Sequence, residues 1–166
     1  MYRENAWKQY SEEERAKALA FAAKYVDFLS ASKTEREAVS EAEAVCKAAG
    51  FADMDALIAA GGSVKPGDRL YRKWMNKSFM AFVVGSEPIE KGMNILGAHI
   101  DSPRIDIKQN PLFEDGDLAY LDTHYYGGIK KYQWLALPLA LHGVIDIKIY
   151  FLFYFFFFFY LLFFFN

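Results

Sequence analysis

A mainly apolar run over residues 93–100 ends in a histidine and an aspartate two positions apart, and this run most constrains the fold. An apolar run without alternation predicts a strand buried on both faces, as in the middle of an α/β sheet. Side chains two positions apart on a strand share a face, so His99 and Asp101 would project together from its end. Pro103 cannot donate a hydrogen bond to a neighbouring strand and therefore marks the start of a loop.

His99 and Asp101 are the candidate site of this sequence. A neutral imidazole is the commonest metal ligand in proteins. A carboxylate beside it can bind the same metal, or accept a hydrogen bond from the other ring nitrogen and so select the tautomer. The residues alone also allow a hydrogen-bonded histidine without a metal. His124 and His142 are interpreted as structural, because neither lies at ligand spacing from a second donor.

Helices are indicated before this run by two capping boxes, in which a Ser or Thr and the Glu three residues later bind each other's backbone N–H groups: Ser11–Glu14 and Thr34–Glu37. We expect one amphipathic helix over about 12–29 and a second that ends at Gly50. The expected apolar stripe of the first comprises Leu19, Ala22, Val26 and Leu29. The expected inward positions of the second are Ala38, Ala42, Val45 and Ala49.

The remaining elements are expected to be one short helix and several strands. The helix covers 53–60, and a hairpin pairs residues 70–75 with 79–84. Two further strands are indicated over 104–108 and 118–126, with turn signals at Asn110-Pro111 and 114–117 between them. The expected fold class is therefore α/β, with helices followed by a mixed sheet.

Two sequence blocks at a plausible separation resemble the M18 family of metallo-aminopeptidases, in the bacterial branch of the aspartyl-aminopeptidase-like enzymes. The blocks are Gly97–Lys108 (GAHIDSPRIDIK) and Thr123–Ile129 (THYYGGI), the second followed by Gln133-Trp134. The likeness extends to about Ile145. It implies that His99 binds zinc and that Asp101 supports the catalytic metal centre.

The resemblance also implies an organisation. Residues 1–109 would begin an incomplete zinc-peptidase catalytic domain, and residues 110–146 would begin an inserted β-rich dimerisation domain. A complete site in the family holds two zinc ions, and its other ligands would lie beyond residue 166. Peptide substrates and a homo-oligomer are implied as partners. The expected function is that of an N-terminal fragment of a zinc aminopeptidase, inactive as this chain.

Residues 147–166 differ from the rest of the chain. All twenty are Ile, Lys, Tyr, Phe, Leu or Asn, the six amino acids that codons made only of A and T can encode. This restriction is typical of translated non-coding DNA, and we favour an artefactual tail. The competing interpretation is a membrane span, since 149–165 is an uninterrupted apolar run at the lower limit of bilayer-spanning length.

Charge and cysteine content narrow the remaining possibilities. A net charge of −2 and a pI of about 5.9 argue against nucleic acid or an anionic membrane surface as a partner. Cys46 is the only cysteine, which excludes an intrachain disulfide and fits a cytoplasmic protein. Two alternatives to the peptidase fragment stay open: a non-catalytic interaction fragment that associates with a full-length homologue, and a tail-anchored membrane protein.

Overall fold

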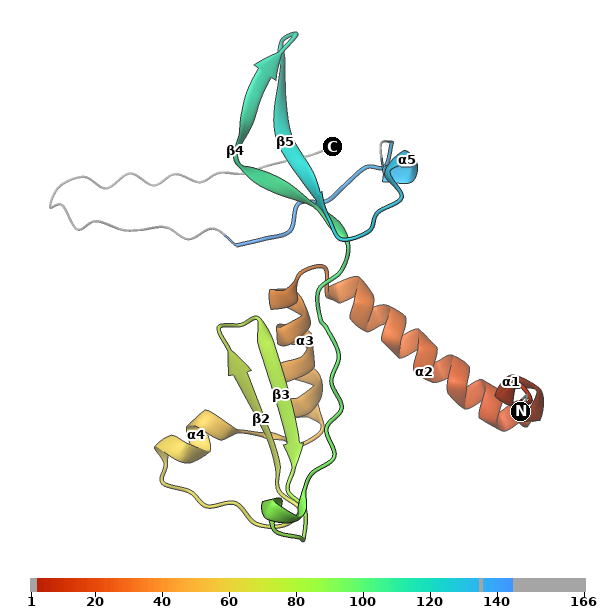
Figure 1. Cartoon of the computed structure of the whole chain (residues 1–166), viewed down its shortest axis with the longest axis vertical. Coiled ribbons are helices and arrows are strands. Elements are labelled where there is room, and N and C mark those ends of the chain that lie inside the picture. The colour runs from red at the N-terminus through yellow and green to blue at the C-terminus, as the bar shows by residue number, and fades with distance from the viewer. Residues whose placement is uncertain (1–2, 135, 145–166) are drawn as a thin grey trace, which may run out of the picture.

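The computed structural model describes residues 3–134 and 136–144 (Figure 1). The predictions for the tail 147–166 therefore lie outside the described residues. In chain order the elements are α1 (Ala6–Gln9), α2 (Glu12–Ala31), α3 (Glu35–Ala48), β1 (Ala52–Asp53), α4 (Met54–Ala59), β2 (Arg69–Trp74), β3 (Ser78–Val83), η1 (Ile89–Lys91), β4 (Arg104–Asp115), β5 (Leu118–Tyr126) and α5 (Lys131–Trp134). Helices followed by a mixed sheet confirm the expected α/β class.

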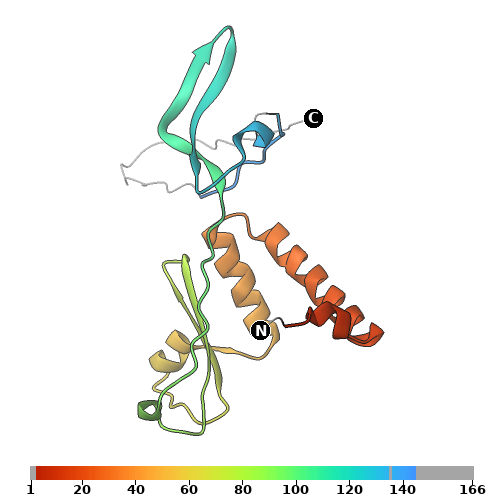
Figure 2. The same cartoon turned by 45° about the vertical axis from the view of Figure 1, so that its right-hand side comes forward.

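The elements form two groups joined by an extended segment. One group contains α3, α4 and the sheet β1–β2–β3, and the other contains the hairpin β4–β5, as both views show (Figures 1 and 2). Residues 92–103 connect the groups without forming a helix or strand. The candidate site therefore lies on the connection, next to the start of β4.

Both capping boxes are present and open the two helices where the sequence predicts. The backbone N–H of Ser11 donates to Glu14 at 2.8 Å, and that of Glu14 donates to the Ser11 hydroxyl at 3.3 Å. Thr34 and Glu37 exchange the same two bonds at 2.8 and 3.3 Å. These bonds satisfy backbone donors that have no partner within the first turn of a helix.

The end of α3 at Gly50 is also confirmed. Gly50 has a φ of +80°, in the left-handed region that favours glycine. Its N–H donates to the carbonyl of Lys47 at 3.0 Å, and the N–H of Phe51 donates to that of Cys46 at 2.9 Å. This pair of bonds is a Schellman motif, which satisfies carbonyls of the last helical turn.

The small sheet begins with a strand that the sequence analysis missed. β1 has two residues and pairs in parallel with β2, while β2 and β3 form the predicted antiparallel hairpin. Met75 and Asn76 both adopt positive φ in the connecting turn. A two-residue strand carries too little periodicity to be recognised in a sequence. Its pairing partners also lie eighteen positions later in the chain.

The core of the described residues lies where α3 covers this sheet. Ala38 and Val39 of α3 and Leu70 and Tyr71 of β2 are each at most 5% exposed. The prediction that Val45 packs inward is wrong, since its side chain is 60% exposed. The reason is that α3 meets the sheet mainly through its first half, and Ala49 is exposed as well.

The second hairpin is longer than predicted. β4 continues through Asn110 and Pro111, where a turn was expected, and its register with β5 shifts between Ile107 and Leu112. Pro111 offers no N–H to a partner strand, which suits such an irregularity. The other predicted turn, at 114–117, is confirmed. Gly116 and Asp117 form it, both with positive φ, as a type I′ hairpin loop requires. β4 spans the domain boundary placed at residues 109 and 110, and that division stays a prediction.

The prediction of a buried strand over 93–100 is wrong. Residues 93–103 have no regular secondary structure, and the Leu96 and Ile95 side chains are 100% and 78% exposed. A strand requires a neighbour that takes up its backbone hydrogen bonds. None of the described strands pairs with this segment, and Met93, Ile95 and Leu96 are exposed.

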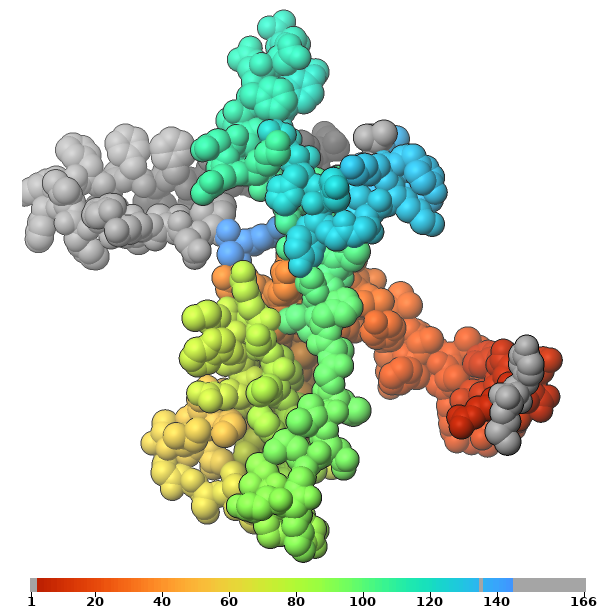
Figure 3. Space-filling view, in the orientation of Figure 1, coloured from red at the N-terminus to blue at the C-terminus, as the bar shows by residue number. Residues whose placement is uncertain are grey.

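The apolar stripe of α2 is likewise exposed. The helix projects from the rest of the molecule (Figure 3), and the Leu19, Val26 and Leu29 side chains are 43–60% exposed. Its existence and start were predictable because they depend on local capping, whereas its burial depends on a partner surface. Across residues 3–134 and 136–144, no helix has both the length and the apolar character needed to cross a membrane.

An ionic cluster around Glu43 ties α3 to β2. The Glu43 carboxylate lies 2.6 Å from the Lys73 ammonium and 2.9 Å from that of Lys47, and accepts a 3.1 Å hydrogen bond from the Tyr71 hydroxyl. The hydrogen bonds from Lys47 and Lys73 lower the pKa of Glu43 from 4.5 to about 2. The ionised carboxylate is thus favoured in the folded chain.

We expect Glu43→Gln to destabilise the chain by about 1 kcal/mol at pH 7, because hydrogen bonds to a charged group are lost. A folded-state pKa below the ordinary value stabilises the fold above pH 4.5, and this stabilisation is lost as the pH falls towards 2. Urea unfolding should show that the free energy of unfolding falls less between pH 7 and pH 3 in Glu43→Gln than in the wild type. Glu41→Gln, on the same helix, is the control. An equal fall in the free energy of unfolding between pH 7 and pH 3 in both variants would contradict the prediction.

We expect Gly50→Ala to destabilise the chain by about 1 kcal/mol, because alanine is strained at a φ of +80°. Space is not the cause, since an added Cβ meets nothing within 4 Å. Gly85→Ala, at a glycine without positive φ, is the matched control. Equal midpoints of urea unfolding for the two variants would refute the assignment.

Candidate metal centre

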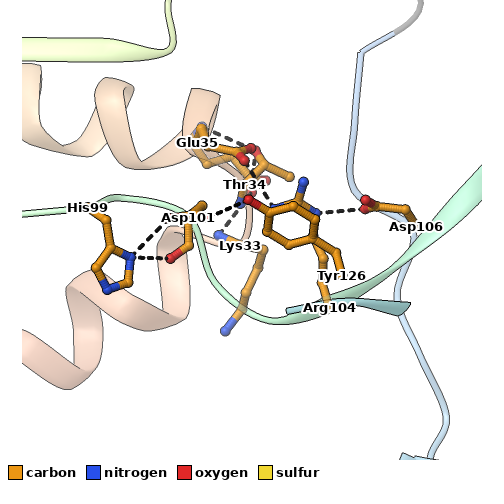
Figure 4. A network of polar contacts seen from close by, with 9 residues as sticks. Lys33, Thr34, Glu35, His99, Asp101, Arg104, Asp106 and Tyr126 are labelled. Carbon is orange, nitrogen blue, oxygen red and sulfur yellow. Dashed lines mark hydrogen bonds and ion pairs between the residues drawn. The ribbon is translucent and has the colours of Figure 1, made fainter. Parts of the chain in front are cut away.

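The His99 and Asp101 side chains meet, although the expected strand is absent. Nδ1 of His99 lies 2.9 Å from Oδ1 of Asp101 and 3.0 Å from the Asp101 backbone carbonyl oxygen (Figure 4). The prediction that the two side chains project together is therefore confirmed in its geometry. The contact joins two residues separated by one position, and it forms without sheet pairing.

This contact determines which imidazole nitrogen is available. An ionised carboxylate and a carbonyl oxygen can only accept hydrogen bonds, so Nδ1 of His99 carries the proton and donates. In the neutral form of the ring, the lone pair is then on Nε2. The His99 side chain is 83% exposed, and within the described residues Nε2 makes no hydrogen bond. The arrangement is the one by which a carboxylate orients a metal-binding histidine.

The other oxygen of the Asp101 carboxylate is bound by Tyr126, at the end of β5. The Tyr126 hydroxyl donates to Oδ2 at 2.6 Å. This bond, followed by the contact with His99, holds the pKa of Asp101 below its ordinary value. The same bond to the carboxylate raises the pKa of Tyr126. Asp101 is therefore ionised and Tyr126 protonated near neutral pH.

Arg104 connects Tyr126 to the first turn of α3. Its guanidinium lies over the Tyr126 ring, 4.3 Å from the ring centre. Its Nε donates to Asp106 at 2.7 Å and one terminal nitrogen donates to Glu35 at 3.1 Å. These carboxylates raise the pKa of Arg104, Asp106 most strongly. A continuous set of contacts thus runs from α3 to His99 (Figure 4).

The other two histidines lie apart from this pair. His124 contacts the backbone carbonyl of Tyr125 at 3.1 Å, and His142 lies 2.9 Å from the Glu37 carboxylate. The hydrogen bond from His142 is the main reason that the pKa of Glu37 is lowered. Their interpretation as structural residues agrees with these contacts.

The described residues supply part of the donor set of a zinc site. An exposed imidazole nitrogen suits zinc, and Asp101 stands where a supporting carboxylate is needed. Zinc in catalytic sites takes three protein ligands. Across the described ranges 3–134 and 136–144, no cluster of three or more His, Cys, Asp or Glu residues is arranged to hold a metal ion. The pair fits one part of a zinc site and leaves the assignment of its roles a prediction.

The sequence does not indicate four members of this network as site residues: Glu35, Arg104, Asp106 and Tyr126. Tyr126 is 25 residues from Asp101, and Glu35 is 69 residues from Arg104. No local spacing connects residues at such separations. The one available signal was the antiparallel pairing of the two predicted strands, which places Arg104 opposite Tyr126.

A family model matches most of the chain. The model described as "Aminopeptidase I zinc metalloprotease (M18)" matches residues 28–150. This range includes α3, the mixed sheet, the hairpin β4–β5 and both residues of the candidate site. The match confirms the family to which the sequence blocks pointed.

Similar proteins and solved structures agree with the match. A "Probable M18 family aminopeptidase 1" of Clostridium acetobutylicum is 49% identical over 141 residues, covering 85% of this chain and 30% of that protein. The protein of the same name from Thermotoga maritima is 41% identical over 145 residues, with 87% and 30% covered.

The crystal structure of aminopeptidase I from Borrelia burgdorferi B31 matches with a TM-score of 0.72 and 40% identity, over 81% of this chain and 32% of that one. The chain spans about 30% of the length of the curated relatives it matches. Sequence, fold and family model agree, and this chain belongs to the M18 family of zinc metallo-aminopeptidases.

Proposed function

We propose that this chain is the N-terminal part of a zinc-dependent aminopeptidase that removes N-terminal residues from peptides. The observation that carries the proposal is the contact of Asp101 with Nδ1 of His99, which leaves Nε2 for a metal. The family match supports the reaction class and the metal. The resemblance further suggests two zinc ions per complete site, a homo-oligomer and, with the single Cys46, a cytoplasmic protein.

Each residue of the pair has a defined task in this proposal. His99 is a metal ligand through Nε2. Asp101 accepts from Nδ1, holds the ring in the required tautomer and adds negative charge beside the site. Zinc, when bound, polarises the scissile carbonyl and makes hydroxide available near neutral pH. A carboxylate general base, which such hydrolysis requires, is not identified among the described residues.

We infer that the 166-residue polypeptide is inactive by itself. One histidine and one aspartate do not form a catalytic zinc site, and the part of the chain that the structure describes contains no larger ligand cluster. Purified polypeptide with added zinc should therefore hydrolyse a panel of peptides no faster than a chelated sample. The longer relative from Clostridium acetobutylicum serves as the active control. Chelator-sensitive hydrolysis by the 166 residues alone would disprove the inference.

A second candidate is a non-catalytic fragment that associates with a full-length homologue. It is favoured by apolar side chains that the described structure leaves exposed on the hairpin β4–β5, including Leu112 at 72% and Leu118 at 59%. A two-stranded hairpin is marginally stable alone and gains stability by packing on another surface. The residues 110–146 assigned to a dimerisation insert would supply such a contact.

The native product in the source cells distinguishes the two candidates. We expect affinity-captured product to have an intact mass well over twice 19.1 kDa, to lack the phenylalanine-rich tail and to release N-terminal residues with added zinc. A His99→Ala variant of that product should lose at least about tenfold in zinc affinity and activity. A product of 19.1 kDa that is captured together with a longer homologous chain would favour the second candidate instead.

A further inference from the structure

Resting on the proposed zinc-peptidase function, we propose that Tyr126 is a positioning residue for the metal site. Its hydroxyl holds the Asp101 carboxylate in the orientation that makes His99 present Nε2 to the metal. Tyr126 itself touches neither metal nor substrate in this proposal. It acts through Asp101, while Arg104 restrains its ring.

The first support is that the two carboxylate oxygens of Asp101 bind different partners. Oδ1 of Asp101 faces Nδ1 of His99 at 2.9 Å, and Oδ2 accepts from the Tyr126 hydroxyl at 2.6 Å. The Asp101 side chain is 35% exposed and lies on a segment without sheet bonds. With one oxygen released, the carboxylate would rotate about its side-chain torsions. The Tyr126 bond therefore restricts which oxygen, and which direction, His99 meets.

The second support is the restraint on Tyr126. The Arg104 guanidinium stacks at 4.3 Å from its ring centre, an arrangement favoured by the attraction of a cation to an aromatic face. Arg104 is in turn held by Asp106 of β4 and Glu35 of α3. Figure 4 shows these side chains converging from three parts of the chain on the segment that carries His99 and Asp101.

The third support is the close approach of the backbone beside Tyr126. Gly127 has a φ of +71°, and a Cβ added there would lie 3.4–3.5 Å from Pro103. Arg104 and Tyr126 are also paired across the hairpin. The end of β5 is thus held against the residues that directly follow Asp101. The backbone contacts of the hairpin therefore help to position the Tyr126 side chain, in addition to its own hydrogen bond to Asp101.

The test compares Tyr126→Phe with Tyr125→Phe in the full chain. Both substitutions remove one hydroxyl and keep the ring, and the Tyr125 ring likewise contacts a cation, with Lys131 at 4.1 Å from its centre. Within the described residues, the Tyr125 hydroxyl makes no hydrogen bond. The chain is labelled with ¹⁵N-histidine and kept in mild detergent, because the uncharged apolar run 149–165 favours aggregation. The two readouts are the His99 tautomer at pH 8.5 and its zinc titration.

We expect the share of the His99 tautomer with the proton on Nδ1 to fall in Tyr126→Phe and to stay unchanged in Tyr125→Phe. The zinc concentration that half-shifts the His99 signals should rise about tenfold in Tyr126→Phe only. An unchanged tautomer and zinc titration in Tyr126→Phe would overturn the proposal. A changed tautomer in a chain whose wild type binds no zinc at His99 would still support the positioning role. The proposed function is then judged separately, by zinc affinity and activity of the His99→Ala variant of the native product.

Two further measurements distinguish the positioning role of Tyr126 from a purely structural role. Backbone amide signals of β4 and β5 report whether Tyr126→Phe keeps the hairpin. If it does not, the wild-type chain supplies the test, since a hydroxyl bound to Oδ2 should shift the ¹³C signal of the Asp101 carboxylate when its proton is replaced by deuterium. Absence of that shift in a folded hairpin would overturn the proposal.

Discussion

The burial of α3 against β2 is the constraint on which the rest of the described structure depends. Val39 and Tyr71 are the largest fully buried side chains, and the Glu43 cluster lies beside them. This packing places the first turn of α3 next to the start of β4, where Glu35 binds Arg104. The candidate pair His99 and Asp101 is thus connected, through Arg104 and Tyr126, to a helix more than sixty residues earlier in the chain.

Features that depend on neighbouring residues were predictable, and pairing between distant segments was not. The capping boxes, the end of α3 at Gly50 and the hairpin β2–β3 each follow from a few neighbouring residues, and each is present. The apolar run 93–100 contains nothing that specifies its neighbour. Its composition suits a buried strand, yet an unpaired backbone cannot form one. The exposed stripe of α2 shows the same distinction between forming an element and burying it.

The candidate site divides in the same way. The contact of His99 with Asp101 involves residues two positions apart, so spacing alone indicated it. Tyr126 and Arg104 enter through the antiparallel register of β4 and β5. The sequence indicates both strands, but it gives no register for them and ends β4 too early. It therefore does not reveal that Tyr126 and Arg104 contact the site. The family resemblance supplied roles for His99 and Asp101 but none for the residues that orient them.

The unpaired segment before the site has a consequence for how a complete catalytic domain would assemble. Asp101 is held by side chains of His99 and Tyr126, and no hydrogen bond within the described residues uses the backbone of residues 93–98. A further strand could therefore pair with the backbone of 93–98 without breaking any hydrogen bond of the Asp101 carboxylate. The His99 imidazole would be oriented before the sheet is complete, so Nε2 would already be in position when the other metal ligands are added.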